Sequence, residues 1–253
     1  MSRNILITGG SSGIGLAMVE TFHQNGDEVW FTYFSQEEKP EEIKGKFPGA
    51  KSFHLNLANY SSITDLVNSL PETPDVVIHN AGLGSATVSK VSSEVHEQDE
   101  ALLKVNAVGT LWLNDLLLPG FEKRGNGKII FLSSVGGGIT QIPGFRYADG
   151  MSKAAIAFLG KALAADLAES QICVFTICPG ATNTPMFAAS TLDGLNESDK
   201  ISLIASLPKG RLIEPREIAE LAYFLTTDAA EVLHGAVLDS SMGLGVNPGL
   251  LKK

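Results

Sequence analysis

The chain has 253 residues, of which 44% are hydrophobic and 19% charged, a composition typical of a folded protein with a sizeable core. Its 28 acidic residues outnumber 19 basic ones, giving a formal net charge of -9 that disfavours partners such as nucleic acid or an anionic membrane surface. Cys173 and Cys178 have no metal-ligand cluster around them, and no signal sequence or bilayer-spanning apolar stretch is evident, so we expect a cytoplasmic protein without a metal.

Short β-branched segments alternate with amphipathic ones along nearly the whole chain. The expected strands are 5–7, 28–33, 52–55, 76–78, 129–132, 174–177 and 236–238, and the expected helices are 15–24, 63–70, 101–118, 153–168 and 217–225. Because parallel strands need crossover connections, this alternation predicts an α/β fold with a doubly wound parallel sheet (a Rossmann fold) in a single domain over 1–253. The polar stretch 181–206 follows a predicted strand and is expected to form a mobile substrate lid.

A glycine-rich loop follows the first predicted strand and leads directly into a helix. It reads Thr8-Gly9-Gly10-Ser11-Ser12-Gly13-Ile14-Gly15. Gly9 permits the sharp turn, Gly13 lets the backbone approach a pyrophosphate, and Gly15 lets the helix pack closely on the sheet. The helix N-terminus offers free N–H groups and partial positive charge to phosphates. The loop therefore predicts a dinucleotide site that includes Gly9, Ser11, Ser12, Gly13, Ile14 and Gly15.

Further motifs follow in order along the chain. They are Asn80-Ala81-Gly82, Val105-Asn106-Ala107, Ser133-Ser134, Pro179-Gly180 with Thr184, Gly210-Arg211, Pro215-Arg216-Glu217-Ile218-Ala219 and Gly235-Ala236-Val237-Leu238-Asp239. With the glycine loop, they resemble the short-chain dehydrogenase/reductase family over nearly the whole chain. The resemblance implies an oxidoreductase that transfers a hydride between a nicotinamide cofactor and a carbonyl or alcohol. It also implies cofactor contacts from Asn80, Ala81, Gly82, Lys153, Pro179, Gly180 and Thr184.

The resemblance assigns roles in the reaction as well. It implies that Asn106 holds a water of a proton relay and that Ser134 positions the substrate oxygen. It also implies that Lys153 holds the ribose and lowers the pKa of a tyrosine four residues before it. In this sequence Asp149 stands four residues before Lys153, and Tyr147 stands six before it.

Two registers are open for the proton-transferring group. If Lys153 is the family lysine, Asp149 fills the tyrosine position; if Tyr147 is the acid, Met151 replaces the lysine. An aspartate, with an ordinary pKa near ~3.9, has no proton to donate at neutral pH, and its side chain stops short of the ~2.6–3.2 Å needed for direct transfer. Tyr147 would lie roughly 120° from Lys153 on a regular helix, so it can contribute only if the helix starts after it. The sequence Ser152-Lys153-Ala154-Ala155 favours the first register.

These registers leave two hypotheses for function. The first, which we favour because the rest of the site is intact, is a working NAD(P)(H)-dependent oxidoreductase in which Tyr147, or a water on Asp149, carries the proton. The second is a catalytically weak dinucleotide-binding relative that acts as a sensor or partner subunit.

The end of the second predicted strand bears on the choice of dinucleotide. An acidic residue there would bind the ribose hydroxyls and repel a 2′-phosphate, but the sequence reads Tyr33-Phe34-Ser35. Ser35 can hydrogen-bond a phosphate, whereas the basic residue that many NADP(H)-preferring relatives carry in the glycine loop is absent. The balance slightly favours NADP(H) over NAD(H), with the adenosine half bound by Tyr33, Ser35, Asn56 and Leu57.

Six apolar residues are expected either to flank the substrate site or to belong to the core, and in the first case they indicate a moderately apolar carbonyl or alcohol. They are Ile142, Phe145, Met186, Phe187, Leu192 and Leu195. The resemblance implies a homodimer or homotetramer paired through helices 101–118 and 153–168. We expect His79 to be a packed or hydrogen-bonded residue rather than a base.

Overall fold

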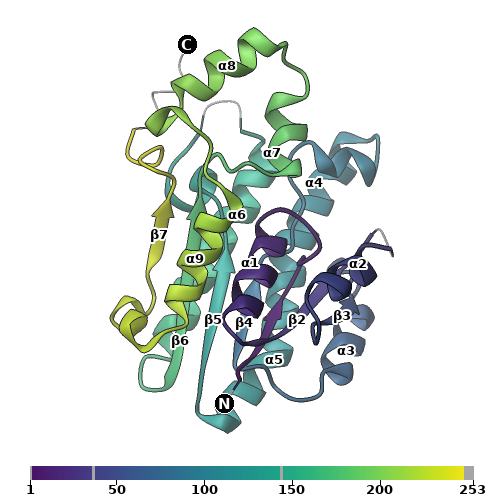
Figure 1. Ribbon diagram of the computed structural model, residues 1–253, viewed down its shortest axis with the longest axis vertical. Coiled ribbons are helices and arrows are strands. Elements are labelled where there is room, and N and C mark those ends of the chain that lie inside the picture. Colours follow the sequence, from purple (N-terminus) through teal and green to yellow (C-terminus); the bar gives the residue numbers. More distant parts are fainter. Residues whose placement is uncertain (1, 36–37, 143–144, 248–253) are drawn as a thin grey trace.

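The computed structural model describes residues 2–35, 38–142 and 145–247. In this part of the chain the strands form one parallel seven-stranded sheet in the order β3-β2-β1-β4-β5-β6-β7 (Figure 1). The strands are β1 (Asn4–Ile7), β2 (Glu28–Tyr33), β3 (Lys51–His54), β4 (Val76–His79), β5 (Asn126–Leu132), β6 (Gln171–Pro179) and β7 (Val237–Ser240). All seven overlap the segments expected to be strands, so the predicted doubly wound parallel sheet is confirmed.

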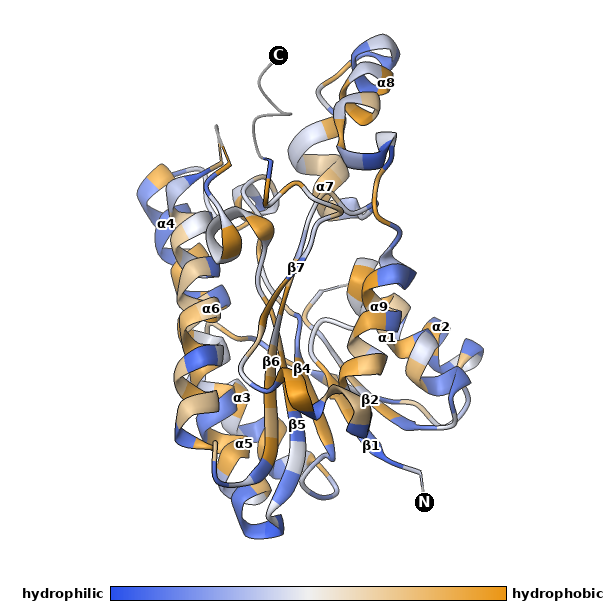
Figure 2. Ribbon diagram, turned by 90° about the vertical axis from the view of Figure 1, so that its left-hand side faces the viewer, coloured by the Kyte–Doolittle hydropathy of each residue, from blue (hydrophilic) through white to orange (hydrophobic). Residues whose placement is uncertain are grey.

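Helices cover both faces of the sheet (Figure 2). One face carries α1 (Gly13–Gln24), α2 (Glu38–Lys46) and α9 (Pro215–Leu225), and the other carries α3 (Tyr60–Ser69), α5 (Thr110–Arg124) and α6 (Tyr147–Asp166). Successive strand residues point to opposite faces, so Ile5 and Ile7 join the core beneath α1 and α9, while Leu6 joins the core beneath α3, α5 and α6. This two-sided burial explains why the strands are apolar throughout.

The centre of the sheet is the point where the chain reverses direction. From β1 the chain proceeds outward through β2 to β3, and it then crosses to β4 on the other side of β1. Ligands of open α/β sheets bind at the carboxyl ends of the strands beside such a reversal. The glycine loop follows β1 and Asn80 follows β4, so the fold brings both to this point.

The helix expected over 101–118 is part of a longer helical segment, Val95–Arg124, composed of α4 (Val95–Leu103), the π-helical η2 (Lys104–Gly109) and α5. By length and composition alone this segment could cross a membrane. The sequence did not indicate such a stretch, because polar residues interrupt the apolar run within the helix. Its inward side chains lie in the core: Leu102, Leu113, Leu117 and Phe121. The segment therefore packs as a core helix.

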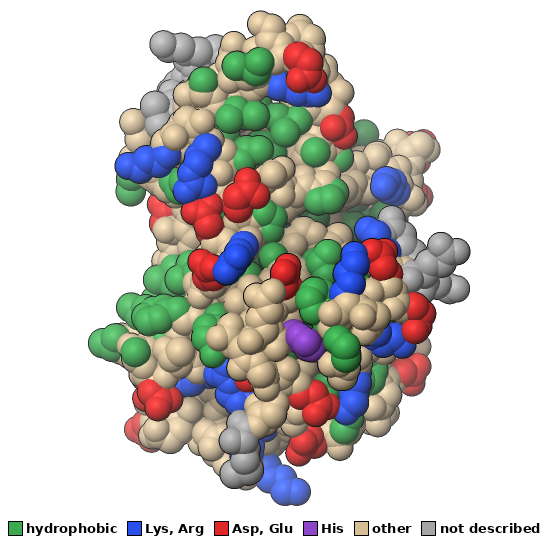
Figure 3. All heavy atoms as spheres, in the orientation of Figure 1, with side chains coloured by type: hydrophobic (Ala, Val, Ile, Leu, Met, Phe, Trp, Pro, Cys, Tyr) green, Lys and Arg blue, Asp and Glu red, His purple; other side chains and the backbone are tan. Residues whose placement is uncertain are grey.

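The segment 181–206 is more regular than the sequence indicated. It contains α7 (Pro185–Phe187), η4 (Ala188–Leu192) and α8 (Glu197–Ser206), and α8 has no buried residue. Figure 1 places α7 and α8 beyond the carboxyl ends of the strands, and Figure 3 shows apolar side chains gathered over that end of the molecule. The remaining short helical turns are η1 (Thr87–Lys90), η3 (Val135–Ile139), η5 (Pro208–Gly210) and η6 (Asp228–Leu233).

Candidate active site

The glycine loop needs glycine for two physical reasons. Gly9 and Gly13 have left-handed backbone conformations, with φ of 69° and 53°, which L-residues with side chains rarely adopt. Gly15 has no such conformation, but a Cβ there would lie 2.2 Å from the carbonyl oxygen of Gly9. Gly9 and Gly13 are therefore required by their conformation and Gly15 by the close approach, and all three are predicted cofactor-binding positions.

The first turn of α1 is open to an anion. Ser12 occupies the N-cap position in an extended conformation, yet its side chain makes no capping hydrogen bond. Ser11 is half-buried, and Ile14 packs partly against the core beneath α1. A Cβ on Gly13 would lie 3.3 Å from the Cγ2 atom of Thr184, so the segment after β6 borders the loop, as expected for a shared ligand site. Uncapped N–H groups at a helix start are the usual receptors for phosphate.

Asn80 holds the glycine loop in place from the end of β4. Its side-chain amide donates to the carbonyl oxygens of Thr8 (2.9 Å) and Gly9 (3.3 Å). The Thr8 hydroxyl in turn accepts from the backbone N–H groups of Asn80 and Ala81, both at 2.9 Å. The side chain of Asn80 therefore supports the loop from within, while Ala81 packs against the core beneath α3, α5 and α6.

The predicted adenosine residues lie at the carboxyl ends of β2 and β3. Tyr33 is half-buried and meets the His54 ring edge-on at 5.7 Å, and Ser35 is exposed. The amide oxygen of Asn56 accepts from the Ala58 N–H at 2.9 Å, so it shapes a local turn. Leu57 is buried in the core, leaving only its backbone for a ligand.

The start of α6 places the two candidates for the proton-transferring group differently. Tyr147 is the first residue of the helix, and its side chain is 83% exposed, whereas Asp149 is only 4% exposed. The condition under which Tyr147 could contribute, a helix beginning after it, is not met. The structure buries Asp149 and leaves Tyr147 at the surface.

Lys153 lies one helical turn after Asp149. A Cβ on Gly82 would lie 3.5 Å from its Nζ atom, so the ammonium group is next to the Asn80-Ala81-Gly82 turn. Burial lowers the pKa of Lys153, and the opposing charge of Asp149 only partly offsets this effect. Among the described residues, none of the ion pairs within 4.0 Å includes Lys153.

Asn106 is buried in the π-helical segment η2. Its amide oxygen accepts from the Leu83 N–H (2.7 Å), and its amide nitrogen donates to the Leu83 carbonyl (2.9 Å) and to the Ser152 hydroxyl (3.0 Å). The side chain thus ties η2 to the loop after β4 and to α6. π-Helical turns are frequent at functional sites.

The two serines that end β5 have different partners. Ser133 is buried, and its hydroxyl donates to the carbonyl oxygen of Lys153 at 2.8 Å. Ser134 is half-buried and accepts from the Gly136 N–H at 3.2 Å, so its hydroxyl hydrogen is free of that contact. Ser133 fixes the lysine backbone, which leaves Ser134 as the hydroxyl available to a ligand.

Sequence reasoning missed Ser85. Its hydroxyl donates to the Oδ2 atom of Asp149 at 2.7 Å, across 64 residues of sequence. The loop that carries Ser85 is fixed by Val88, which is buried with Leu102 and Ala148. Its position, three residues after Asn80-Ala81-Gly82, was the only available signal, and a serine in such a loop is unremarkable.

The segments after β6 and β7 form the remaining border of the candidate site. Pro179 ends β6, and a Cβ on Gly180 would lie 2.8 Å from Ser241, so glycine permits that contact. Met186 of α7 reaches the loop after β4, because a Cβ on Gly84 would lie 2.8 Å from its sulfur.

The other residues expected to flank the substrate divide into two groups. Ile142 and Phe145 border the glycines after β5, since a Cβ on Gly136 would lie 3.4 Å and 3.3 Å from them. Phe187, Leu192 and Leu195 are half-buried in or beside α7 and η4.

His79 is a packed residue in the structure. Its ring stacks on Phe131 at 4.8 Å with an interplanar angle of 10°. Its Nε2 atom is buried without a partner in the described part of the chain, and burial lowers the pKa of His79 to about 3. The imidazole is therefore neutral at physiological pH, which does not favour a role as a base.

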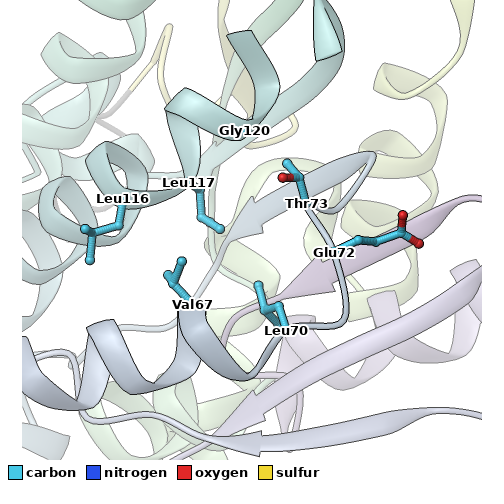
Figure 4. Close-up of a pocket in the computed structure, with 7 residues that line it drawn as sticks. All are labelled: Val67, Leu70, Glu72, Thr73, Leu116, Leu117 and Gly120. Carbon is cyan, nitrogen blue, oxygen red and sulfur yellow. The ribbon is translucent and has the colours of Figure 1, made fainter. Parts of the chain in front are cut away.

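A separate pocket of ≈ 230 Å³ opens between α3 and α5 (Figure 4). Its lining consists of Val67, Leu70, Glu72, Thr73, Leu116, Leu117 and Gly120. Glu72 and Thr73 precede β4, so the pocket lies at the amino ends of the strands, whereas the glycine loop follows a carboxyl end. No predicted site residue lines it.

Comparison with known proteins finds similar chains among oxidoreductases. A family model described as "Enoyl-(Acyl carrier protein) reductase" matches residues 9–245. The chain is 31% identical to "Oxidoreductase UcpA" of Salmonella typhimurium, over 96% of this chain and 98% of that protein.

Two solved structures extend the likeness to complexes with cofactors. An actinorhodin polyketide ketoreductase with NADPH is 26% identical, covers 96% of this chain and 97% of its own, and superposes with a TM-score of 0.85. A 3-ketoacyl-(acyl-carrier-protein) reductase from Brucella melitensis complexed with NADH is 25% identical, with coverages of 96% and 98% and a TM-score of 0.82.

Proposed function

Because the chain belongs to the short-chain dehydrogenase/reductase family and is an NAD(P)-dependent oxidoreductase, we propose that it transfers a hydride between a nicotinamide dinucleotide and a moderately apolar carbonyl or alcohol. The observation that carries this proposal is the glycine loop, with Gly9 and Gly13 in left-handed conformations and an uncapped α1 behind them. The bound dinucleotide would supply the hydride acceptor or donor. Every other part of the reaction falls to side chains of this chain.

The cradle fits a dinucleotide, since a Cβ at Gly9 would clash with Ala81 at 2.9 Å and one at Gly13 would approach Thr184. We assign the pyrophosphate to Gly9, Ser11, Ser12, Gly13, Ile14 and Gly15, and the nicotinamide half to Asn80, Ala81, Gly82, Lys153, Pro179, Gly180 and Thr184. The adenosine half falls to Tyr33, Ser35, Asn56 and Leu57. Without an acid at the end of β2, NADP(H) is slightly favoured over NAD(H).

In the catalytic centre, Ser134 orients the substrate oxygen, Lys153 holds the ribose, and Asn106 fixes η2 against α6. Asp149 takes the position of the family tyrosine. A carboxylate can accept a proton, so we assign Asp149 the role of base in alcohol oxidation. The short side chain of Asp149 does not reach the substrate oxygen, so a water next to the Ser85–Asp149 pair would carry the proton between them.

The test is cofactor turnover with a panel of ketones, aldehydes and their alcohols. We expect the wild type to oxidise alcohols and to reduce ketones weakly. We expect Asp149→Tyr to raise ketone reduction by roughly 10²–10⁴-fold, the usual contribution of a positioned acid. Turnover in Asp149→Tyr with none above buffer in the wild type would refute a working enzyme.

That outcome would support a second candidate, a dinucleotide-binding sensor or partner subunit with little activity. The observation in its favour is that Asp149 is buried at the site while Tyr147 is exposed. A sensor binds the dinucleotide as tightly as an enzyme does, so calorimetry together with turnover separates the two candidates.

We also propose that the segment 181–206 acts as a lid and that the protein pairs with copies of itself. Met186 already reaches Gly84, and α8 stands clear of the core, so α8 is free to move. The outer face of α6 exposes Tyr147, Met151 and Phe158, the last at 74%, and an apolar stripe of this kind suits a homodimer or homotetramer. Sedimentation should give an oligomer that Phe158→Glu dissociates.

A further inference from the structure

Ser85 and Asp149 together present an acceptor to the site. An ionised carboxylate only accepts hydrogen bonds, so the Ser85 hydroxyl hydrogen points to the Oδ2 atom of Asp149, at 2.7 Å. The lone pairs of the serine oxygen are then available to a donor from another molecule. Ser85 is half-buried and Asp149 is buried behind it, so Ser85 is the more accessible of the two groups.

The carboxylate changes which charge the site tolerates. Reduction of a carbonyl builds negative charge on oxygen and needs a proton, and Asp149 would repel that charge. Proton transfer requires contact at ~2.6–3.2 Å, whereas electrostatic attraction falls only with the inverse of distance. The short side chain of Asp149 can therefore stabilise a cation from a distance at which it cannot exchange a proton.

Within the described structure Lys153 offsets the charge of Asp149 only in part. Its Nζ lies beside Gly82, and no ion pair within 4.0 Å joins it to Asp149. The hydroxyl of Ser152, which could have reached the carboxylate, donates instead to the backbone carbonyl of Asp149 at 2.7 Å. Among the described residues Ser85 is the side chain that bonds the carboxylate, and none of the ion pairs within 4.0 Å includes Asp149, so its negative charge is only partly compensated.

We propose, resting on the hydride transfer proposed above, that the site accepts substrates whose reacting group is a cationic carbon–nitrogen double bond, an iminium. Asp149 faces the positive charge, and Ser85 accepts from an N–H group. The reduced dinucleotide gives a hydride to the iminium carbon, the π pair becomes the nitrogen lone pair, and the products are an amine and the oxidised dinucleotide. No proton is needed, so the missing tyrosine is no handicap.

The experiment compares N-methyl-3,4-dihydroisoquinolinium, a fixed cation, with 1-tetralone, a neutral ketone of the same bicyclic size. We expect wild-type kcat/KM for the cation to exceed that for the ketone by about 10²-fold or more, and Asp149→Asn to remove most of that advantage. Asp65→Asn is the matched control, because it removes the same charge at an exposed position on α3. With 3,4-dihydroisoquinoline, which carries N–H when protonated, Ser85→Ala should lose about tenfold, and less with the N-methyl cation.

A binding measurement keeps the test independent of turnover. Calorimetry with protonated N-methyl-tetrahydroisoquinoline on protein saturated with oxidised dinucleotide should show binding that Asp149→Asn weakens by at least about tenfold. Equal turnover of ketone and cation, or an Asp149→Asn variant within twofold of the wild type, overturns the proposal. So does a protein that binds dinucleotide but neither reduces the cation nor binds the amine. Failure to bind any dinucleotide instead refutes the proposed function itself.

Discussion

The glycine loop after β1 and the first turn of α6 border the same candidate site, but they differ in how strictly the backbone dictates their residues. In the loop, each glycine is required by a left-handed conformation or a contact, so the sequence has no freedom. At the start of α6 the backbone is an ordinary helix, which many residue types can adopt, so the backbone does not dictate the buried residue at position 149. The backbone therefore requires glycine in the loop, whereas it does not dictate which residue stands at position 149.

The largest effect is expected from breaking the loop. In Gly15→Val the new Cβ atom would lie only 2.2 Å from the carbonyl oxygen of Gly9, so the turn cannot close. We expect dinucleotide binding and turnover to fall below detection, as measured by calorimetry and cofactor absorbance. As a control, Gly45→Ala on α2 meets no atom within 4 Å and should bind normally. Wild-type affinity in Gly15→Val would contradict a phosphate site here.

The second largest effect is expected at Ser134, and it tests whether this serine takes part in the reaction. Ser134→Ala removes the hydroxyl that we propose orients the substrate, so we expect kcat/KM to fall by roughly 10²-fold with little change in dinucleotide affinity. The paired control is Ser133→Ala, which removes the bond to the Lys153 carbonyl and should act chiefly on stability. If Ser134→Ala turned over at the wild-type rate, Ser134 would have no role in the reaction.

A smaller effect concerns His79, which joins the end of β4 to the Asn80 turn. Its folded-state pKa of about 3 lies below the ordinary value of 6.5, so the unfolded state binds more protons between these values. Stability is therefore lost as pH falls below about 6.5, by about 2 kcal/mol between about pH 7.5 and about pH 5. Chemical denaturation of His79→Leu should show a flatter pH dependence, and an unchanged slope would exclude His79 as the cause.

The smallest effect is expected at Tyr147. Tyr147 is 83% exposed, so Tyr147→Phe should keep kcat/KM within about twofold at every pH tested. A loss of tenfold or more, with normal dinucleotide binding, would show that Tyr147 enters the site when substrate binds.

The same contrast explains what the sequence could and could not predict. The strands were readable because residues such as Ile5, Leu6 and Ile7 are buried on alternate faces, which makes the whole run apolar. The loop was readable because its spacing is local. The sequence around Lys153 favoured the register with Asp149 in the tyrosine position. It left open whether Tyr147 or Asp149 carries the proton, because that depends on the residue at which α6 begins.

Contacts between distant segments were equally hidden. The Ser85–Asp149 bond joins the loop after β4 to α6, and neither residue carries a local signal of the other. The helices of the segment 181–206 were missed because polar residues dominate α8, which buries none of its side chains.

The most direct test of the account is a crystal structure with bound dinucleotide. We predict the pyrophosphate on the glycine loop, with Asp149 and Ser85 next to the nicotinamide, Ser134 nearby and Tyr147 on the outer face of α6. A structure in which the Tyr147 hydroxyl faces the nicotinamide beside Ser134, with Asp149 turned away, would contradict it.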